Sequence, residues 1–318
     1  MAAGLRAGGF AEVRELPLAD GGEGTLDALL AARGGSRRTA RVTGPLGDTV
    51  EAEYGVLPDG TAVVEMARAS GLSLVRRNDP LRASTRGTGE LIAAARRAGA
   101  ERVIVGVGGS ATTDGGLAAV EALGWSLGGL EVAVACDVDT KFLDAARVYG
   151  PQKGATAAQV ELLSRRLASV AEIYRQRTGV DVTELEGAGA AGGLAGGLAA
   201  LGARLEPGFE VVAFAAGLEE VLEGVDLVVT GEGRVDTTSF EGKVVGGVLE
   251  WAAEVGIEHR AVIAGQVTDE ARDELSVLGA RVYPLVERVW SSAEAYSRAA
   301  TLVQEAAVEA ARVALRTR

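Results

Sequence analysis

The stretch from Val225 to Gly247, VDLVVTGEGRVDTTSFEGKVVGG, decides how the chain is expected to fold. It opens on VDLVVT, an apolar run rich in β-branched residues, which is typical of a buried parallel strand. Gly231-Glu232-Gly233 then stops the strand with a backbone that can turn sharply. Good helix formers follow from about Lys243 to Glu254. The stretch therefore predicts a strand, a loop and a helix of an open parallel sheet.

Charged side chains gather in and just after this loop: Glu232, Arg234, Asp236 and Lys243. In open α/β sheets, ligands bind beyond the carboxyl ends of strands, where helix N-termini present N–H groups. These side chains are therefore candidates for chemistry on an anion. An ordinary turn with solvated charges explains the stretch, taken alone, equally well.

The composition argues against several classes of function. The 318 residues carry a net charge of −12, and only 4% are aromatic, so we expect no nucleic-acid partner. The single cysteine, Cys136, excludes an internal disulfide, and the single histidine, His259, excludes a histidine-rich metal site. No apolar stretch is long enough to span a membrane, and MAAGLRAGGF lacks a signal segment. We therefore expect a cytoplasmic protein with no membrane partner.

The same order of elements occurs near the start of the chain. Ala11 to Leu18 alternates as a strand does, and the loop Ala19 to Thr25 leads into a helix from Leu26 to Ala32. Residues Arg37 to Val64 differ, because they have the pattern of an antiparallel meander. A meander between strand–helix units predicts an inserted domain.

Beyond Asp226, strands and helices alternate regularly, which predicts a doubly wound parallel sheet. We expect an α/β protein in which residues 1–35 and 225–318 form one domain, and residues 36–224 form an inserted mixed α/β domain. The expected elements of the last part are strands at Asp226 to Thr230, Ala261 to Ala264 and Val282 to Val286, with helices at Asp269 to Leu278 and Ala293 to Leu315.

The best candidate for phosphate binding is Gly108 to Gly116, GGSATTDGG, between a predicted strand and a predicted helix. Its backbone N–H groups and the hydroxyls of Ser110 and Thr112 can cradle phosphate oxygens. Asp114 could hold Mg²⁺ there. A capped helix explains the same residues, because Thr and Asp are common N-caps.

A pair of carboxylates, Asp137 and Asp139, follows the predicted strand Val132 to Cys136. Alternate residues of a strand point to the same side, so the pair could bind a metal or act as a general base. A polar loop explains them nearly as well. Gln152 and Lys153 could clamp an anion, although a lysine at a helix start is usually solvated.

The stretch Gly187 to Gly192 matches the G-x-G-x-x-G spacing of dinucleotide-binding folds. That fingerprint has to follow a strand, and DVTELE before it is a poor strand. Glycines for close helix packing are therefore favoured at this position.

Several loops together resemble the bacterial glycerate kinase family of the two-domain type. They occur in family order: Ala19 to Thr25 (ADGGEGT), Ser84 to Ile92 (STRGTGELI), Gly108 to Gly116 (GGSATTDGG), Cys136 to Asp139 (CDVD), Gly150 to Ala155 (GPQKGA), Gly187 to Leu194 (GAGAAGGL) and Thr230 to Lys243 (TGEGR, then D and GK). The resemblance implies a discontinuous flavodoxin-like domain carrying an inserted domain similar to a restriction-endonuclease fold. It also implies ATP- and Mg²⁺-dependent phosphorylation of D-glycerate to 2-phosphoglycerate.

Phosphoryl transfer needs alignment and charge neutralisation more than covalent chemistry. Within the matched loops we expect catalytic roles for Asp20, Arg234, Asp236 and Lys243, with Asp20 or Asp236 orienting the attacking hydroxyl. Metal ligands are expected among Asp114, Asp137 and Asp139. Substrate and nucleotide contacts are expected from Gly21, Gly22, Glu23, Thr25, Arg86, Gly108, Gly109, Ser110, Thr112, Gln152, Lys153 and Glu232.

The chain departs from the family through internal deletions. It also departs at its start, because the family opens with a strand and a loop close to APDSFKG and this sequence shows neither. A flavodoxin-like sheet has the order 2-1-3-4-5, so the missing strand would be central. We therefore expect Ala11 to Leu18 and Asp226 to Thr230 to face each other across a gap. We also expect a truncated reading of a longer gene or a loss of activity.

The alternative function is a non-catalytic relative that binds a small anion or a nucleotide, and a kinase for another hydroxy acid is a third candidate. The substrate expected for the enzyme is a small molecule, and the protein could form a homodimer.

Overall fold

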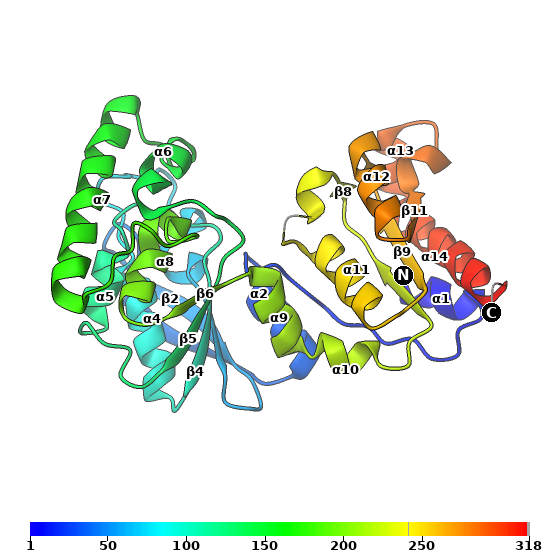
Figure 1. Cartoon of the computed structure of the whole chain (residues 1–318), viewed down its shortest axis with the longest axis horizontal. Helices are drawn as coiled ribbons and strands as arrows, with labels where there is room; N and C mark the ends of the chain where they lie inside the picture. Colours follow the sequence, from blue (N-terminus) through cyan, green and yellow to red (C-terminus); the bar gives the residue numbers. More distant parts are fainter. Residues whose placement is uncertain (241, 317–318) are drawn as a thin grey trace. The chain divides into compact units, whose positions relative to one another are not determined.

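The computed structural model describes residues 1–240 and 242–316, and the chain forms two compact units (Figure 1). Unit 1 combines Met1–Pro17 with Gly217–Arg318, and unit 2 is the continuous segment Leu18–Ala216. Unit 2 is therefore inserted into unit 1 in sequence.

The unit boundaries differ from the expected boundaries at residues 35/36 and 224/225. Helix α2 (Thr25–Arg33) belongs to unit 2, because Leu26 and Leu29 are fully buried and the helix packs against other elements of that unit. Helices α9 (Gly208–Ala216) and α10 (Leu218–Leu222) are separated by Gly217, which has a φ of 77° and begins the second segment of unit 1.

Unit 2 is built on a six-stranded mixed sheet with the order β1-β2-β3-β4-β5-β6. The first three strands pair antiparallel, as the predicted meander requires, and the last four pair parallel. The strands are β1 (Ser36–Thr43), β2 (Thr49–Val56), β3 (Ala62–Glu65), β4 (Arg102–Gly106), β5 (Glu131–Ala135) and β6 (Arg204–Glu206). The parallel half brings the carboxyl ends of β3, β4 and β5 to one edge.

Helices cover both faces of this sheet (Figure 1). Leu91 and Ile92 of α4 are fully buried in a cluster with Ala62 and Val64 of β3. Val63 points the other way and is also fully buried, on the face covered by α2 and α9. The remaining helices are α3 (Ala67–Ser70), α4 (Arg86–Arg97), α5 (Leu117–Ala122), α6 (Ala145–Tyr149), α7 (Ala157–Thr178), α8 (Ala190–Ala200) and α9 (Gly208–Ala216), with a 3-10 turn η1 at Leu72–Leu74 and another at Pro151–Lys153.

Unit 1 contains a parallel three-stranded sheet with the order β11-β9-β7, which confirms the predicted strand–helix alternation. The predicted last helix is two helices, α13 and α14. The main elements are α1 (Ala2–Gly8), α10 (Leu218–Leu222), β7 (Leu227–Thr230), β8 (Arg234–Val235), α11 (Val244–Glu254), β9 (His259–Ala264), β10 (Gln266–Val267), α12 (Asp269–Val277), β11 (Ala280–Pro284), α13 (Ser292–Ser297) and α14 (Ala299–Arg316).

The strand predicted at Ala11 to Leu18 was wrong, because this segment forms no strand in the structure. A strand needs a neighbour for its backbone hydrogen bonds. Among the described residues, β7 pairs with β9 alone, so one edge of β7 has no strand beside it. The segment is held through a side chain instead: Nη1 of Arg14 donates to the carbonyls of Val221 and Glu223.

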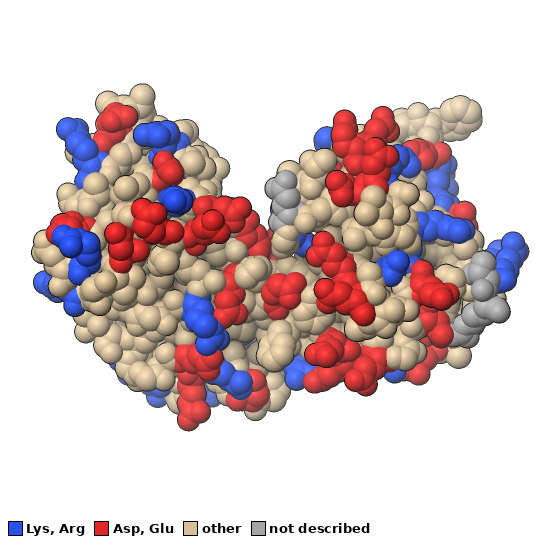
Figure 2. Space-filling view, viewed as in Figure 1, with Lys and Arg blue, Asp and Glu red and all other residues tan. Residues whose placement is uncertain are grey.

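Within the described part of the chain, none of the helices has the length and apolar character that crossing a membrane requires. Figure 2 shows acidic side chains spread over the visible face, in keeping with the net charge of −12. A bound anion must therefore be attracted by local donors rather than by the whole surface.

The packing of α4 predicts a large cost for truncating Leu91. Replacing it with Ala should lower the free energy of unfolding by about 2–5 kcal/mol, since the side chain is fully buried. Urea unfolding followed by circular dichroism measures this change. Val148→Ala, at a side chain 52% exposed, is the control and should cost less than about 0.5 kcal/mol. A Leu91→Ala cost as small as that of the control would contradict the described core.

Candidate active site

The carboxyl edge of the parallel strands in unit 2 carries a cavity of about 260 Å³. β4 leads into Val107–Ser110, β5 leads toward Asp137, and the loop beginning at Asp20 contributes to the same wall. This is the edge at which open α/β sheets bind ligands. The expected site residues that line the cavity are Asp20, Gly21, Gly22, Gly108, Gly109, Ser110, Asp137 and Gln152.

The glycines of these loops are required because the backbones touch. A Cβ atom on Gly106 would lie 2.6 Å from the carbonyl oxygen of Gly21, and one on Gly108 would lie 2.9 Å from the Cα of Gly22. A Cβ on Gly208 would lie 2.0 Å from the carbonyl oxygen of Asp20. Real Cβ contacts are not this short, so larger residues would push the loop at Asp20 away from the strand ends.

Asp114 is a structural carboxylate in this fold. Its Oδ2 accepts hydrogen bonds from the backbone N–H of Thr85 at 2.8 Å and from the Thr85 hydroxyl at 2.9 Å, and its Oδ1 accepts from Gly116 N–H at 3.1 Å. Burial raises its pKa despite these donors. Asp114 does not line the cavity. These contacts give Asp114 a structural role rather than the expected magnesium role, although it is not the N-cap of the following helix, which is Gly116.

Lys153 is buried, with 2% of its surface exposed, and does not line the cavity that the neighbouring Gln152 lines. Its Nζ donates to the carbonyl oxygen of Thr112 at 2.6 Å. Desolvation lowers its pKa to about 7, although the Asp114 carboxylate opposes this shift. The lysine thus holds the backbone of the GGSATTDGG loop, and it does not reach the cavity as an anion clamp would.

The two aspartates after β5 do not lie on a strand. β5 ends at Ala135, so the alternation expected to bring Asp137 and Asp139 to one side does not apply. Asp137 lines the cavity, and its Oδ1 accepts the N–H of Gly208 at 2.6 Å, at the start of α9. Asp139 is not part of the lining. Across the described residues, no group of three or more His, Cys, Asp or Glu side chains could hold a metal ion.

Three further expected residues of unit 2 lie away from this cavity. Thr25 is fully buried and its hydroxyl donates to the Gly22 carbonyl at 2.8 Å, so it shapes the loop from behind. Thr112 is fully buried and is not part of the cavity lining. Arg86 lies on the first turn of α4, where its Nε donates to Glu90 at 3.0 Å.

The charged residues expected after β7 form a cluster of their own in unit 1. The Asp236 carboxylate accepts from the N–H and the hydroxyl of Thr238 at 3.1 and 2.7 Å, and these hydrogen bonds lower its pKa. Nε of Arg234 lies 3.6 Å from the Asp236 carboxylate, and Nζ of Lys243 donates to the Thr238 hydroxyl at 3.3 Å. Glu232 lies in the same loop, where its carbonyl accepts Gly265 N–H.

The structure adds lining residues that sequence reasoning missed, among them Tyr149 and Ala191. The Tyr149 hydroxyl is 2.8 Å from the Thr140 hydroxyl, and burial raises its pKa. The sequence signal that could have identified Tyr149 is its position directly before the GPQKGA motif. Ala191 has a φ of 53°. A Cβ atom on Gly192 would lie 2.0 Å from the carbonyl oxygen of Thr112, so the stretch from Gly187 to Gly192 serves close packing, as the sequence favoured.

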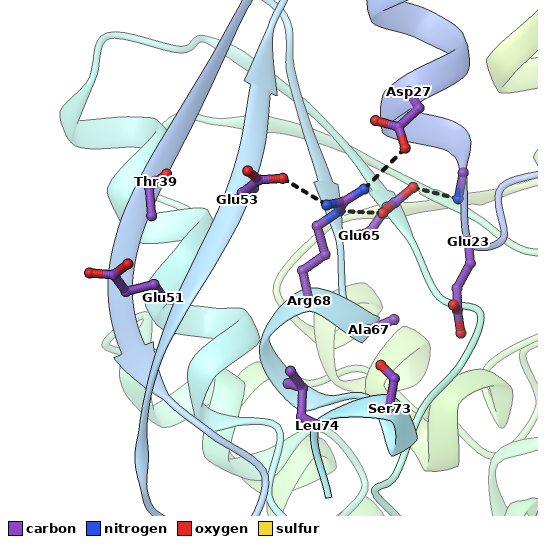
Figure 3. A pocket seen from close by; sticks show the side chains of 11 residues that line it. Glu23, Asp27, Thr39, Glu51, Glu53, Glu65, Ala67, Arg68, Ser73 and Leu74 are labelled. Atoms are coloured by element: carbon purple, nitrogen blue, oxygen red, sulfur yellow. Dashed lines mark hydrogen bonds and ion pairs between the residues drawn. The ribbon is translucent and has the colours of Figure 1, made fainter.

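A second hollow, of about 560 Å³, lies beside the same loop and includes Glu23 in its lining (Figure 3). Carboxylates surround Arg68, whose side chain projects among them (Figure 3). The acidic lining residues are Glu23, Asp27, Glu51, Glu53 and Glu65. Their excess of negative charge disfavours a phosphate ligand in this hollow, so the cavity at Gly108–Ser110 is the better nucleotide candidate.

Comparisons with known proteins agree on one family. A model described as the glycerate kinase family matches residues 1–130 and 126–315. Glycerate 2-kinase of Escherichia coli (strain K12) is 44% identical over 299 residues, which cover 82% of this chain and 78% of the relative. Glycerate kinase of Halalkalibacterium halodurans is 41% identical over 336 residues, with 93% and 88% covered. A crystal structure from Salmonella typhimurium LT2, provisionally named glycerate kinase 2, has a TM-score of 0.83 and 36% identity, and covers 99% of this chain and 92% of that chain.

The buried Lys153 predicts a pH dependence of stability. Its pKa falls from 10.5 to about 7 on folding, so between these values the unfolded chain binds a proton that the folded chain lacks. The contribution of Lys153 to stability is therefore lowest below pH 7 and rises with pH up to the unfolded value. Relative to Lys153→Met, the wild type should gain about 1–3 kcal/mol between about pH 7 and about pH 9.5.

Urea unfolding at several pH values measures this difference. Lys141→Met is the control, because Lys141 has a half-exposed side chain and its difference from the wild type should stay flat in this range. A flat difference for Lys153→Met as well would mean that Lys153 stays charged when buried.

Proposed function

Because the chain belongs to the glycerate kinase family, we propose that it transfers a phosphoryl group from ATP to D-glycerate, forming 2-phosphoglycerate and ADP. The observation that carries the proposal is the meeting of several family motifs around one cavity. The loops that contain Asp20, Ser110, Asp137 and Gln152 are far apart in sequence and line the same wall.

Phosphate binding is assigned to the loop after β4. Gly108 and Gly109 present backbone with no side chain, and Ser110, a residue 9% exposed, adds a hydroxyl to the lining. Donors of this kind act on phosphate oxygens without a net charge of their own. Lys153 and Asp114 hold this loop from behind, so its donors are fixed before the nucleotide arrives.

Orientation of the glycerate hydroxyl is assigned to Asp20. A carboxylate can accept the proton of an attacking hydroxyl when it lies within hydrogen-bond reach. Asp20 lines the cavity, and its Oδ1 also accepts the N–H of Gly22 at 3.2 Å, which restrains the carboxylate. Within unit 1, the expected catalytic roles of Arg234 and Lys243 are kept as part of the proposal, and Asp236 holds Arg234.

The donor set of the cavity fits Mg²⁺, which prefers oxygen ligands. Asp20 and Asp137 supply carboxylates and Ser110 supplies a hydroxyl in the same lining. When bound, Mg²⁺ would neutralise charge on the phosphates and align them. Of the expected metal ligands Asp114, Asp137 and Asp139, the proposal keeps Asp137, because Asp114 is bound by Thr85 and Gly116 and neither Asp114 nor Asp139 lines the cavity.

The finer description of the fold is also a proposal. The parallel sheet of unit 1, with helices packed on its strands, supports a flavodoxin-like unit. The mixed sheet of unit 2 supports the expected likeness to a restriction-endonuclease fold. Glycerate is the proposed small-molecule partner.

One observation favours the alternative, a relative that binds a small anion or nucleotide without turnover. β7 has an edge with no strand beside it among the described residues, and residues 11–18 are extended without a ladder. Unpaired backbone of this kind costs about 1–3 kcal/mol per buried group, which would weaken unit 1.

The assay that separates these functions measures ADP release with ATP, Mg²⁺ and a panel of small hydroxy acids. Turnover should be fastest with D-glycerate. Nucleotide binding by calorimetry without ADP release from any acid would favour the non-catalytic relative. Faster turnover with another acid would change the substrate but not the reaction.

Arg234→Ala should lower kcat/KM by about 100-fold or more if the guanidinium contacts the transferring charge. Arg312→Ala, at an exposed position on α14, is the control and should leave the rate unchanged. A change below about threefold, with the fold intact by circular dichroism, would make Arg234 a surface residue.

Asp137→Asn should raise the Mg²⁺ concentration needed for half-maximal rate, since it removes a proposed carboxylate ligand. Asp139→Asn is the matched control two residues away and should leave the magnesium titration as in the wild type. Equal effects of the two variants would mean that the metal is held elsewhere.

A further inference from the structure

Glu65 is a carboxylate buried at the end of the central strand β3, with 3% of its surface exposed. A charged group this deep is tolerated only when it is paired. Its Oε1 accepts the backbone N–H groups of Gly24 at 2.8 Å and Leu26 at 2.9 Å. Its Oε2 accepts the Nε–H of Arg68 at 2.6 Å (Figure 3).

The two N–H groups that Glu65 binds belong to the amino end of α2. Helices leave their first N–H groups without partners in the helix, and a side chain of the N-cap residue usually satisfies one of them. Here the N-cap is Gly24, which has a φ of 98° and no side chain. Glu65 therefore caps α2 from another element, and its negative charge also suits the helix dipole.

This cap fixes one end of the loop that lines the candidate active site. The loop runs from Asp20 through Gly22, both in the cavity wall, to Gly24 at the cap. Its other contacts include the close backbone approaches to Gly106, Gly108 and Gly208 and the hydrogen bond from the Thr25 hydroxyl to the Gly22 carbonyl. Between them, Glu65 and these approaches set where the Asp20 carboxylate lies.

Arg68 holds the Glu65 carboxylate in turn. Its Nη1 donates to Glu53 on β2 at 2.8 Å, and its Nη2 lies 3.5 Å from Asp27 on α2 (Figure 3). Arg37 of β1 also forms ion pairs with Asp27 and Glu53, and neither of these pairs involves Glu65. The guanidinium of Arg68 therefore neutralises Glu65 and aims it at the loop.

We propose that Glu65, oriented by Arg68, is a positioning residue of the active site, acting through the Asp20–Gly24 loop. The proposal rests on the function proposed above, because it assumes that this loop contacts substrate. Misplacement of a reacting group by about 1 Å can cost about 100-fold in rate, so a loop released at one end should slow the reaction.

The test compares Glu65→Gln, Arg68→Gln and, as matched control, Arg37→Gln. The amide of Glu65→Gln cannot accept from both Arg68 and the loop, since one of its ends donates. Glu65→Gln and Arg68→Gln should each lower kcat/KM for D-glycerate at least about 10-fold, measured per folded molecule. Arg37→Gln should stay within about twofold of the wild type, because Arg37 touches the same acids but not Glu65.

A second readout does not depend on catalysis. Native-state hydrogen exchange in peptides covering residues 18–26 should be at least about 10-fold faster in Glu65→Gln and Arg68→Gln, and unchanged in Arg37→Gln. The double variant of Glu65→Gln and Arg68→Gln should lower kcat/KM and speed hydrogen exchange no more than Glu65→Gln alone does. Both changes remove the same connection, from Arg68 through Glu65 to the loop.

Unchanged exchange and unchanged kinetic constants in folded Glu65→Gln overturn the proposal. If Glu65→Gln does not fold, Arg68→Gln decides by the same criteria, since its side chain is partly exposed. Faster exchange with unchanged kinetic constants also overturns it, because the loop would then be held without positioning anything. If the wild type releases no ADP, the proposed function has failed, and the exchange data alone decide whether Glu65 positions the loop.

Discussion

The close approach of the loop at Asp20 to the ends of β4 and β5 is the constraint on which the candidate site depends. Gly21, Gly106, Gly108 and Gly208 allow backbone to pass backbone at distances that any Cβ would forbid. Because of this approach, a carboxylate from the start of unit 2 shares a wall with the glycine loop after β4. Main-chain contacts of this kind are stiff, so the cavity has its shape before a ligand binds.

Charged side chains outside the cavity lining secure the same loops. Asp114 ties the GGSATTDGG loop to the start of α4, Lys153 holds the carbonyl of Thr112, and Glu65 caps α2 at the end of the Asp20 loop. Glu65 and Lys153 are costly to bury, and each is paired with backbone groups of the loop that it holds. Among the charges of the matched motifs in unit 2, Asp20 and Asp137 therefore face the cavity, whereas Asp114 and Lys153 support its wall.

Unit 1 depends on a different constraint, the hydrogen bonding of strand edges. Its sheet ends at β7, which pairs only with β9 among the described residues. Residues 11–18 alternate as a strand does, yet they form no β-ladder with another strand. Alternating side chains can give a segment one apolar face, but its backbone also needs a neighbouring strand for hydrogen bonding. Arg14 secures this segment through carbonyl contacts near the end of α10. Stability within unit 1 is therefore expected to come chiefly from α14 and the clusters on the two faces of β9.

The sequence by itself determined the local elements and the membership of the family. Apolar runs, turn glycines and helix formers act over a few residues, so the meander, the parallel strands β7, β9 and β11, and most helices could be predicted. It also identified the loops that line the cavity, since Gly108–Ser110, Asp20 and Asp137 lie in matched motifs.

Only the tertiary structure decided which polar groups face that cavity. The partners of these charges come from other elements of the fold: Asp114 is bound by Thr85, Lys153 donates to Thr112, and Glu65 is oriented by Arg68. Whether a charge binds a ligand or holds a loop depends on these neighbours, and no local pattern contains them.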